Sequence, residues 1–276
     1  MKDIVRKRVL HPIEGMEAVD VRRGLACPGG DGEPLVLHLY RSSASAAARL
    51  PAVVLVPGYP GKGMRRVLGC GFTEMGSTIS WAELIAASGM AAITYDNRQP
   101  AADLTAVLAW LRASADTLSI DPGRIGLWAS SGNVPVALAA LMDQGKALRC
   151  AAFCYGYMLD LDGSTAVAHA SRQFGFVNAA AGRSPSDLPR ELPVFLARAG
   201  RDEMPGLNEG IDRFVARALA GNLPVTVTNH AEGPHAFDLF DDSAATRETV
   251  ELVLAFLRGR LATRSDEPSA RAAPVA

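Results

Sequence analysis

The stretch Arg124-Ile125-Gly126-Leu127-Trp128-Ala129-Ser130-Ser131-Gly132-Asn133 decides the fold. It predicts a short apolar strand that turns sharply into a helix over residues 134–142. A serine on such a strand-to-helix turn is held in a strained backbone conformation that exposes its hydroxyl, and the N–H groups that follow point to the same place. We therefore expect a reactive serine at this turn.

Two adjacent serines compete for the tip of the turn. The close approach of strand and helix requires small residues two positions before and two positions after the reactive serine. Ser131 has Ala129 and Asn133 at these positions, whereas Ser130 would place the bulky Trp128 there. Ser131 is therefore the predicted nucleophile. Asn133 departs from the glycine of the G-x-S-x-G pattern, although asparagine tolerates unusual backbone angles better than most residues.

Apolar strands alternate with helices on both sides of this turn. The predicted strands cover residues 53–56, 90–95, 151–155, 193–197 and 224–228, and the predicted helices cover 80–88, 103–115, 134–142, 211–220 and 246–257. Strands without polar interruptions are typical of a mostly parallel sheet covered by helices on both faces. Residues 18–26 and 35–40, on either side of a glycine-rich turn, predict an N-terminal antiparallel hairpin.

The chain is expected to form a single α/β domain over residues 1–261. Residues 160–189 show little periodicity, and segments of this length in compact domains are usually functional lids or insertions. We interpret them as a small cap or an insertion. The last segment, residues 262–276, is rich in Arg, Ser, Pro and Ala and is expected to be a disordered tail.

Composition excludes several classes of protein. Of 276 residues, 49% are hydrophobic and 21% charged, which is typical of a folded domain, and the net charge of −1 predicts neither a nucleic-acid nor a membrane partner. The N-terminus lacks the apolar core of a secretion signal, so we expect a cytoplasmic protein. Four cysteines are too few for a disulfide framework, and Cys150 and Cys154, about 13 Å apart along one strand, lie beyond disulfide reach. No spacing indicates a metal or a cofactor.

Four motifs in a fixed order resemble those of the α/β-hydrolase superfamily, in particular the dienelactone-hydrolase-like and carboxylesterase-like enzymes. The resemblance covers roughly residues 35–261. The four motifs are Val54-Leu55-Val56-Pro57-Gly58-Tyr59-Pro60-Gly61, Asp121-Pro122-Gly123-Arg124-Ile125-Gly126-Leu127-Trp128, Pro193-Val194-Phe195-Leu196-Ala197-Arg198-Ala199-Gly200-Arg201-Asp202 and Gly233-Pro234-His235-Ala236-Phe237. The resemblance implies an oxyanion loop, a nucleophile turn, an acid and a histidine, in that order.

A serine nucleophile needs an imidazole to take its proton, and a carboxylate to orient that imidazole. Asp202 follows a buried strand directly and is the predicted acid; Asp160, after the preceding strand, is the rival. His235 lies in a loop after a strand and is the predicted base; His230, at the end of that strand, is the rival. We interpret the remaining histidines, His11, His38 and His169, as surface or packing residues.

The backbone N–H groups of Tyr59 and Gly132 are the predicted oxyanion donors. Tyr155 and Tyr157, just past a strand end, either line the pocket or pack in the core. The resemblance implies a serine hydrolase that cleaves a small ester or lactone through an acyl-enzyme, without cofactor or metal, as a monomer or a homo-oligomer. The alternatives are an acyltransferase or peptidase on the same residues, and a catalytically silent binding module.

Overall fold

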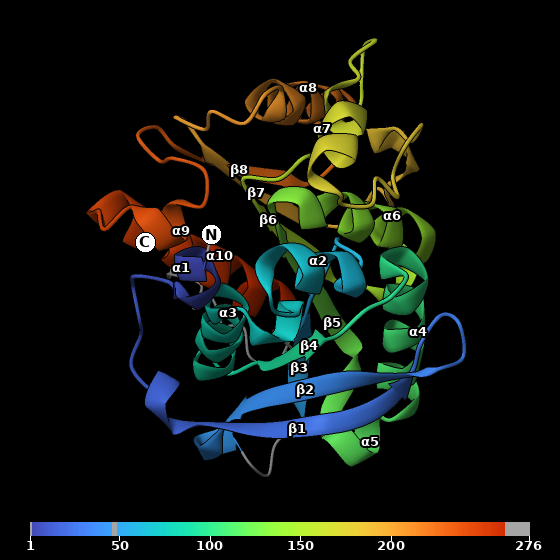
Figure 1. Ribbon diagram of the computed structural model, residues 1–276, viewed down its shortest axis with the longest axis vertical. Helices are drawn as coiled ribbons and strands as arrows, with labels where there is room; N and C mark the ends of the chain where they lie inside the picture. Colours follow the sequence, from blue (N-terminus) through green and yellow to red (C-terminus); the bar gives the residue numbers. More distant parts are fainter. Residues whose placement is uncertain (1, 46–48, 263–276) are drawn as a thin grey trace, which may run out of the picture.

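The computed structural model describes residues 2–45 and 49–262, whose strands form one eight-stranded sheet in the order β1-β2-β4-β3-β5-β6-β7-β8. β1 and β2 pair antiparallel and lie at one end of the sheet, and β3 to β8 are parallel (Figure 1). The predicted parallel sheet and N-terminal hairpin are thus confirmed. The strands are β1 (Val19–Pro28), β2 (Pro34–Ser42), β3 (Leu50–Leu55), β4 (Ala91–Tyr95), β5 (Ile120–Ser130), β6 (Cys150–Cys154), β7 (Val194–Ala199) and β8 (Val225–His230).

Helices cover both faces of the sheet. α4, α6 and α8 bury apolar side chains against one face, and α3 and α10 against the other. The helices are α1 (Lys2–Arg6), α2 (Gly61–Leu68), α3 (Gly76–Ala87), α4 (Pro100–Ala113), α5 (Ala115–Leu118), α6 (Val134–Gln144), α7 (Ala166–Phe174), α8 (Leu207–Ala220), α9 (Phe237–Phe240) and α10 (Ala244–Leu261). This arrangement explains why the central strands are apolar on both sides.

Burial of the central strands holds the layers together. Every residue of β4 and of β6 is buried, and β3 is buried from Ala52 to Leu55. Each fully buried Val, Leu or Ile stabilises the fold by about 1.5–3 kcal/mol relative to an exposed one. Because β5 lies between β3 and β6, its carboxyl end is fixed by neighbours on both sides. The turn that follows β5 is therefore attached to a strand that is paired on both sides.

Five helices of the described chain, α1, α2, α5, α7 and α9, were not predicted. α2 contains two glycines and buries only Met64, and α7 lies inside the aperiodic segment 160–189 and buries only Val167 and Ala170. Short helices with one or two buried residues leave little periodic signal in a sequence. Residues 263–276 of the predicted tail lie outside the described residues.

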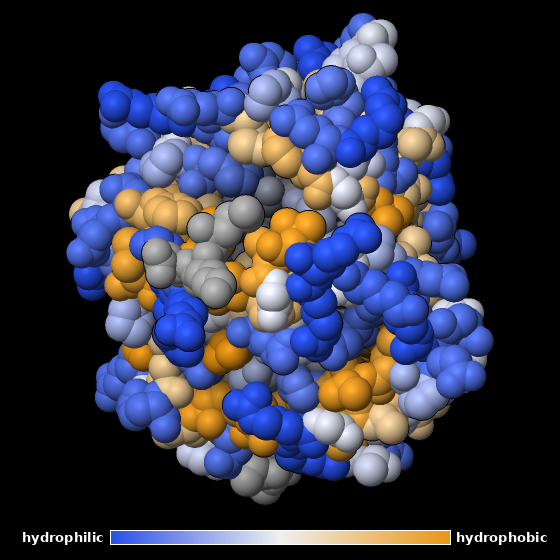
Figure 2. Space-filling view, in the orientation of Figure 1, coloured by the Kyte–Doolittle hydropathy of each residue, from blue (hydrophilic) through white to orange (hydrophobic). Residues whose placement is uncertain are grey.

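The distribution of hydrophobic residues on the surface and the state of the cysteines can be compared with the expectations from composition. On the face shown in Figure 2, hydrophobic residues reach the surface in separate patches among hydrophilic ones. Within the described chain, no helix combines the length and apolar character needed to cross a membrane. Cys150 and Cys154 are buried free thiols, as their spacing predicts, and burial raises the pKa of Cys150 to about 12.

Candidate active site

The structure brings three predicted residues into one hydrogen-bonded chain. The Oγ of Ser131 lies 2.9 Å from Nε2 of His235, and Nδ1 of His235 lies 2.7 Å from Oδ2 of Asp202. The Asp202 side chain is fully buried, whereas 27% of the His235 side chain is exposed. In this geometry Nδ1–H donates to the carboxylate, which leaves Nε2 free to accept the proton of the serine hydroxyl.

The backbone decides which serine occupies the tip of the turn. Ser130 is extended, with φ −135° and ψ 154°, and ends β5. Ser131 has φ +53°, a left-handed conformation that is unfavourable for a residue with a Cβ atom. α6 then begins at Val134. Ser131 therefore stands on a strained strand-to-helix turn, in the register that the small Ala129 predicts.

The two candidate acids have different partners. Besides His235, Asp202 binds the backbone N–H of Met204 through Oδ1, at 2.9 Å. Asp160 instead accepts the N–H groups of Val167 and Ala168 at the start of α7, at 2.8 and 2.9 Å. Because a carboxylate stabilises the first turn of a helix, Asp160 has a structural role.

His230 is also committed elsewhere. It is buried, and its Nε2 lies 2.9 Å from Oδ2 of Asp241 and 2.8 Å from Oγ1 of Thr246, at the start of α10. The other three histidines lie apart from this hydrogen-bonded chain. His11 is buried, His38 accepts the N–H of Gly24, and His169 is exposed.

The loop after β3 packs directly on the serine turn. A Cβ atom on Gly58 would lie 2.5 Å from both Cα of Asn133 and the carbonyl oxygen of Gly132, so only glycine fits there. The amide Oδ1 of Asn133 accepts the Gly58 N–H at 2.7 Å in a buried hydrogen bond. Asn133, which replaces the usual glycine, therefore ties this loop to the turn.

The orientation of the next peptide follows from a second hydrogen bond. The carbonyl of Gly58 accepts the N–H of Val177, from the segment after α7, at 2.9 Å. Because the peptide is trans, the N–H of Tyr59 points away from Val177. Tyr59 and Gly132 belong to the two backbone segments in contact, as an oxyanion site requires.

Aromatic side chains surround the turn. The rings of Tyr59 and Tyr157 both contact Phe176, with centroids 5.9 and 5.2 Å apart. A Cβ atom on Gly132 would lie 2.4 Å from Oη of Tyr59 and 2.7 Å from Cδ1 of Phe176. Burial raises the pKa of Tyr59 to about 12, against the opposite effect of its hydrogen bond with Ser131. These side chains restrict the space beside the serine.

A buried polar cluster lies beneath His235. Tyr155, directly after β6, packs its ring against the imidazole with a centroid distance of 5.1 Å. Its hydroxyl donates to Oδ1 of Asp238 at 2.6 Å, and Nε1 of Trp81 donates to Oδ2 at 2.7 Å. Tyr155 and Ala236 both have positive φ, at 38° and 55°. Together with Ser131, three residues with side chains and positive φ thus lie at this site.

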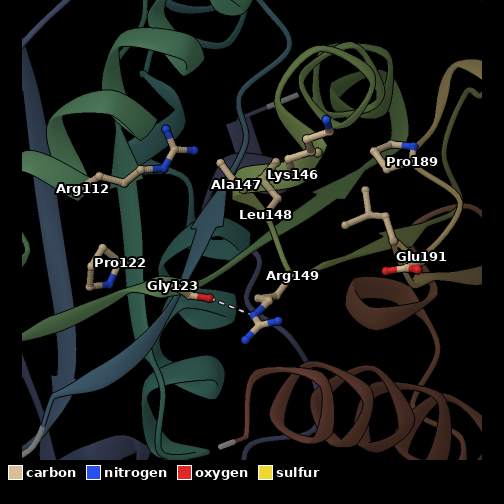
Figure 3. A pocket seen from close by; sticks show the side chains of 11 residues that line it. Arg112, Pro122, Gly123, Lys146, Ala147, Leu148, Arg149, Pro189 and Glu191 are labelled. Atoms are coloured by element: carbon tan, nitrogen blue, oxygen red, sulfur yellow. Dashed lines mark hydrogen bonds between the residues drawn. The ribbon is translucent and has the colours of Figure 1, made fainter.

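Other hollows and clusters lie elsewhere. A cavity of about 460 Å³ is lined by residues such as Arg112, Lys146 and Arg149, and Arg149 donates to the carbonyl of Gly123 (Figure 3). Gly123 lies near the amino end of β5 and Ser131 follows its carboxyl end, so this cavity belongs to the opposite edge of the sheet. In the described part of the chain, no group of three or more His, Cys, Asp or Glu is placed to hold a metal ion.

Known structures with this architecture include several esterases. The bacterial heroin esterase is 17% identical, with a TM-score of 0.72 over 90% of this chain and 86% of that one. Brefeldin A esterase, described as a bacterial homologue of human hormone sensitive lipase, is 16% identical, with a TM-score of 0.72 over 94% and 82%. A hyperthermophilic esterase from the archaeon Pyrobaculum calidifontis is 19% identical, with a TM-score of 0.65 over 87% and 85%.

No protein-family model and no curated protein matches the sequence. At identities below 20%, the structural likeness establishes the fold, which is the α/β-hydrolase fold that the four motifs predict. The serine turn, the loop after β3 and the loops after β7 and β8 all lie at the carboxyl edge of its sheet.

Sequence reasoning missed three features of the site. The sequence indicates Asn133 only as a departure from glycine and Tyr59 only through its backbone N–H, and it gives no role to Asp238. The one available signal for Asp238 was its position three residues after His235. Its partner Trp81 is 157 residues away, so no local pattern connects them.

The Asn133→Ala variant tests the bond that ties the loop to the turn. The Gly58 N–H would be left buried without an acceptor, which costs about 1–3 kcal/mol. We expect a lower melting temperature and a loss of kcat for ester cleavage of about 10- to 100-fold, with a smaller change in KM.

The matched control is Asn229→Ala, which removes an exposed amide that accepts a hydrogen bond from Arg198. Equal effects on kcat in the two variants would show that Asn133 does not position the loop.

Proposed function

We propose that this chain is a serine hydrolase that cleaves a small carboxylic ester or lactone through an acyl-enzyme. The observation that carries the proposal is the hydrogen-bonded chain of Ser131, His235 and Asp202 on a strained turn at the carboxyl edge of the sheet. The esterases that share the fold support the reaction class. Neither a metal nor a cofactor is part of the proposed reaction.

Acylation begins with proton transfer. Nε2 of His235 takes the proton of the Ser131 hydroxyl as Oγ attacks the substrate carbonyl carbon. Asp202 holds the imidazole in the tautomer with hydrogen on Nδ1 and stabilises the imidazolium that forms. The C–O bond of the ester then breaks, and the imidazolium gives its proton to the leaving alkoxide. A water molecule, activated by His235 in the same way, hydrolyses the acyl-enzyme.

The negative charge of the tetrahedral intermediate requires fixed donors. We assign this role to the backbone N–H groups of Tyr59 and Gly132. The Val177–Gly58 hydrogen bond supports this assignment, because it turns the Tyr59 N–H away from the cap segment, and Asn133 holds the same loop from its other side. A donor of this kind contributes about 10²- to 10³-fold in rate.

The surroundings support a small substrate. The side chains of Tyr59 and Phe176 lie so close to Gly132 that they leave little room beside Ser131. We interpret residues 160–189 as a cap, because Phe176 and Val177 contact the serine turn and the loop after β3.

A fluorophosphonate probe tests the proposal directly. The probe phosphonylates an activated serine, so we expect stoichiometric labelling, located at Ser131 by peptide mass spectrometry. A panel of p-nitrophenyl esters from acetate to decanoate, together with lactones and anilides, then identifies the bond cleaved. We expect the highest kcat/KM for short acyl chains. An unlabelled protein that turns over no member of the panel would identify a silent binding module instead.

A further inference from the structure

Asp238 is a buried carboxylate that the proposed triad does not use. It is 1% exposed, and burial raises its pKa, against the opposite effects of hydrogen bonds from Tyr155 and Trp81. Both partners are neutral donors. A buried carboxylate without a cationic partner is costly, and such groups are concentrated at functional sites.

The hydrogen bonds indicate that Asp238 carries its negative charge. Each carboxylate oxygen receives one donor, and the distance from the Tyr155 hydroxyl to Oδ1 is only 2.6 Å. This length is typical of a hydroxyl that donates to an ionised oxygen. Tyr155 in turn presents its ring to His235 in an edge contact, at 66° between the ring planes. The carboxylate is thus one side chain away from the imidazole.

The polar and charged groups that face His235 come from four segments. Ser131 follows β5, Asp202 follows β7, Tyr155 follows β6, and Asp238 lies in α9, three residues after His235. An exposed ion pair between Arg201 and Glu232 flanks the histidine loop and is screened by solvent. Among these described groups, Asp202 and Asp238 are the buried carboxylates.

We propose that Asp238 is a positioning residue for His235, which fixes the imidazole through Tyr155 and stabilises the imidazolium with its charge. The proposal rests on the proposed function, because the imidazolium forms when the Ser131 proton moves to Nε2. The Coulomb interaction between Asp238 and His235 supports it. In a poorly solvated site, such an interaction is stronger than in water.

The test is the titration of His235 in the variant Asp238→Asn, followed by NMR of the ¹⁵N-labelled imidazole. The asparagine can still accept from Trp81 and can donate to the Tyr155 oxygen, so the packing is kept while the charge is lost. Removing a negative charge disfavours the imidazolium. We therefore expect the titration midpoint of His235 to lie at lower pH in Asp238→Asn than in the wild-type protein. The rising limb of kcat/KM against pH should move with it.

The matched control is Asp242→Asn, which removes an exposed carboxylate four residues further on. We expect no change in the His235 midpoint in this variant. An unchanged midpoint in Asp238→Asn, with or without a loss of stability, would reduce Asp238 to a structural link between α3, β6 and α9.

A second measurement needs no variant. In the wild-type protein labelled with ¹³C at the Asp carboxyl, Asp238 should remain ionised throughout the pH range in which His235 titrates. A protonated Asp238 in that range would overturn the proposal. Both titrations observe His235 and Asp238 without substrate, so they remain decisive if the chain cleaves no ester and the proposed function fails.

Discussion

The Ser131→Ala variant should lose nearly all ester cleavage while it keeps its fold. The hydroxyl is the only group removed, and without it His235 has no nucleophile to activate. Removal of the serine or the histidine of such a triad lowers kcat by about 10⁶-fold, with a residual rate that comes from the oxyanion donors and binding. Steady-state hydrolysis of a short p-nitrophenyl ester measures the loss, and circular dichroism checks the fold. The fluorophosphonate label should disappear as well.

Ser130→Ala is the matched control for this prediction. Ser130 is the extended last residue of β5, and His235 is hydrogen-bonded to its neighbour. We expect the control variant to keep its activity within a few-fold. Activity that survives in Ser131→Ala and disappears in Ser130→Ala would move the nucleophile by one residue and overturn the proposed triad.

The second large effect is expected for Asp202→Asn. The amide can still bond to Nδ1 of His235, but it can donate a hydrogen there and so stabilise the wrong imidazole tautomer. In a comparable triad the same change lowers kcat by about 10⁴-fold. Asp202 is fully buried and also binds the Met204 N–H, so a smaller side chain would leave a cavity. Asparagine is chosen because it keeps the volume of the side chain. The kcat of the purified variant, compared at the pH optimum of the wild type, measures the effect.

Asp160→Asn separates the two candidate acids. Asp160 accepts two backbone N–H groups at the start of α7, so its substitution should lower the melting temperature by a few degrees and leave kcat nearly unchanged. The reverse pattern, a severe loss in Asp160→Asn and a mild one in Asp202→Asn, would place the acid after β6.

Much of the fold could be predicted because its signals are local. The strands that became β3, β4, β6 and β7 are short apolar runs, and each is buried on both sides in the sheet. The boundaries differ by a few residues: the helix expected over 211–220 begins at Leu207, and the one over 246–257 extends from Ala244 to Leu261. Short helices such as α2 could not be predicted, because helix propensity alone does not stabilise them. They depend on tertiary contacts, which a local sequence pattern does not reveal.

The site also contains residues that local sequence signals predict and residues that only long-range contacts place. Ser131, Asp202 and His235 each follow a strand, and the carboxyl ends of parallel strands meet at one edge, so their proximity could be expected. The side chains that hold this geometry act over long separations: Asn133 reaches Gly58 across 75 residues, and Trp81 reaches Asp238 across 157. Contacts between residues so far apart in the sequence leave no periodic pattern, so the sequence does not predict them.

The three left-handed residues at the site have a consequence for the thermodynamics of the whole chain. Ser131, Tyr155 and Ala236 all carry side chains at positive φ, and each such residue costs about 1–3 kcal/mol. The free energy of unfolding of a globular domain is only about 5–15 kcal/mol, so the strain at these three residues offsets a substantial part of the stability that the core contributes. Glycine would relieve the strain at each position, but at Ser131 it would remove the nucleophile, and at Tyr155 it would remove a buried ring that packs against His235. Heat-resistant variants of this chain should therefore carry their substitutions away from Ser131 and Tyr155.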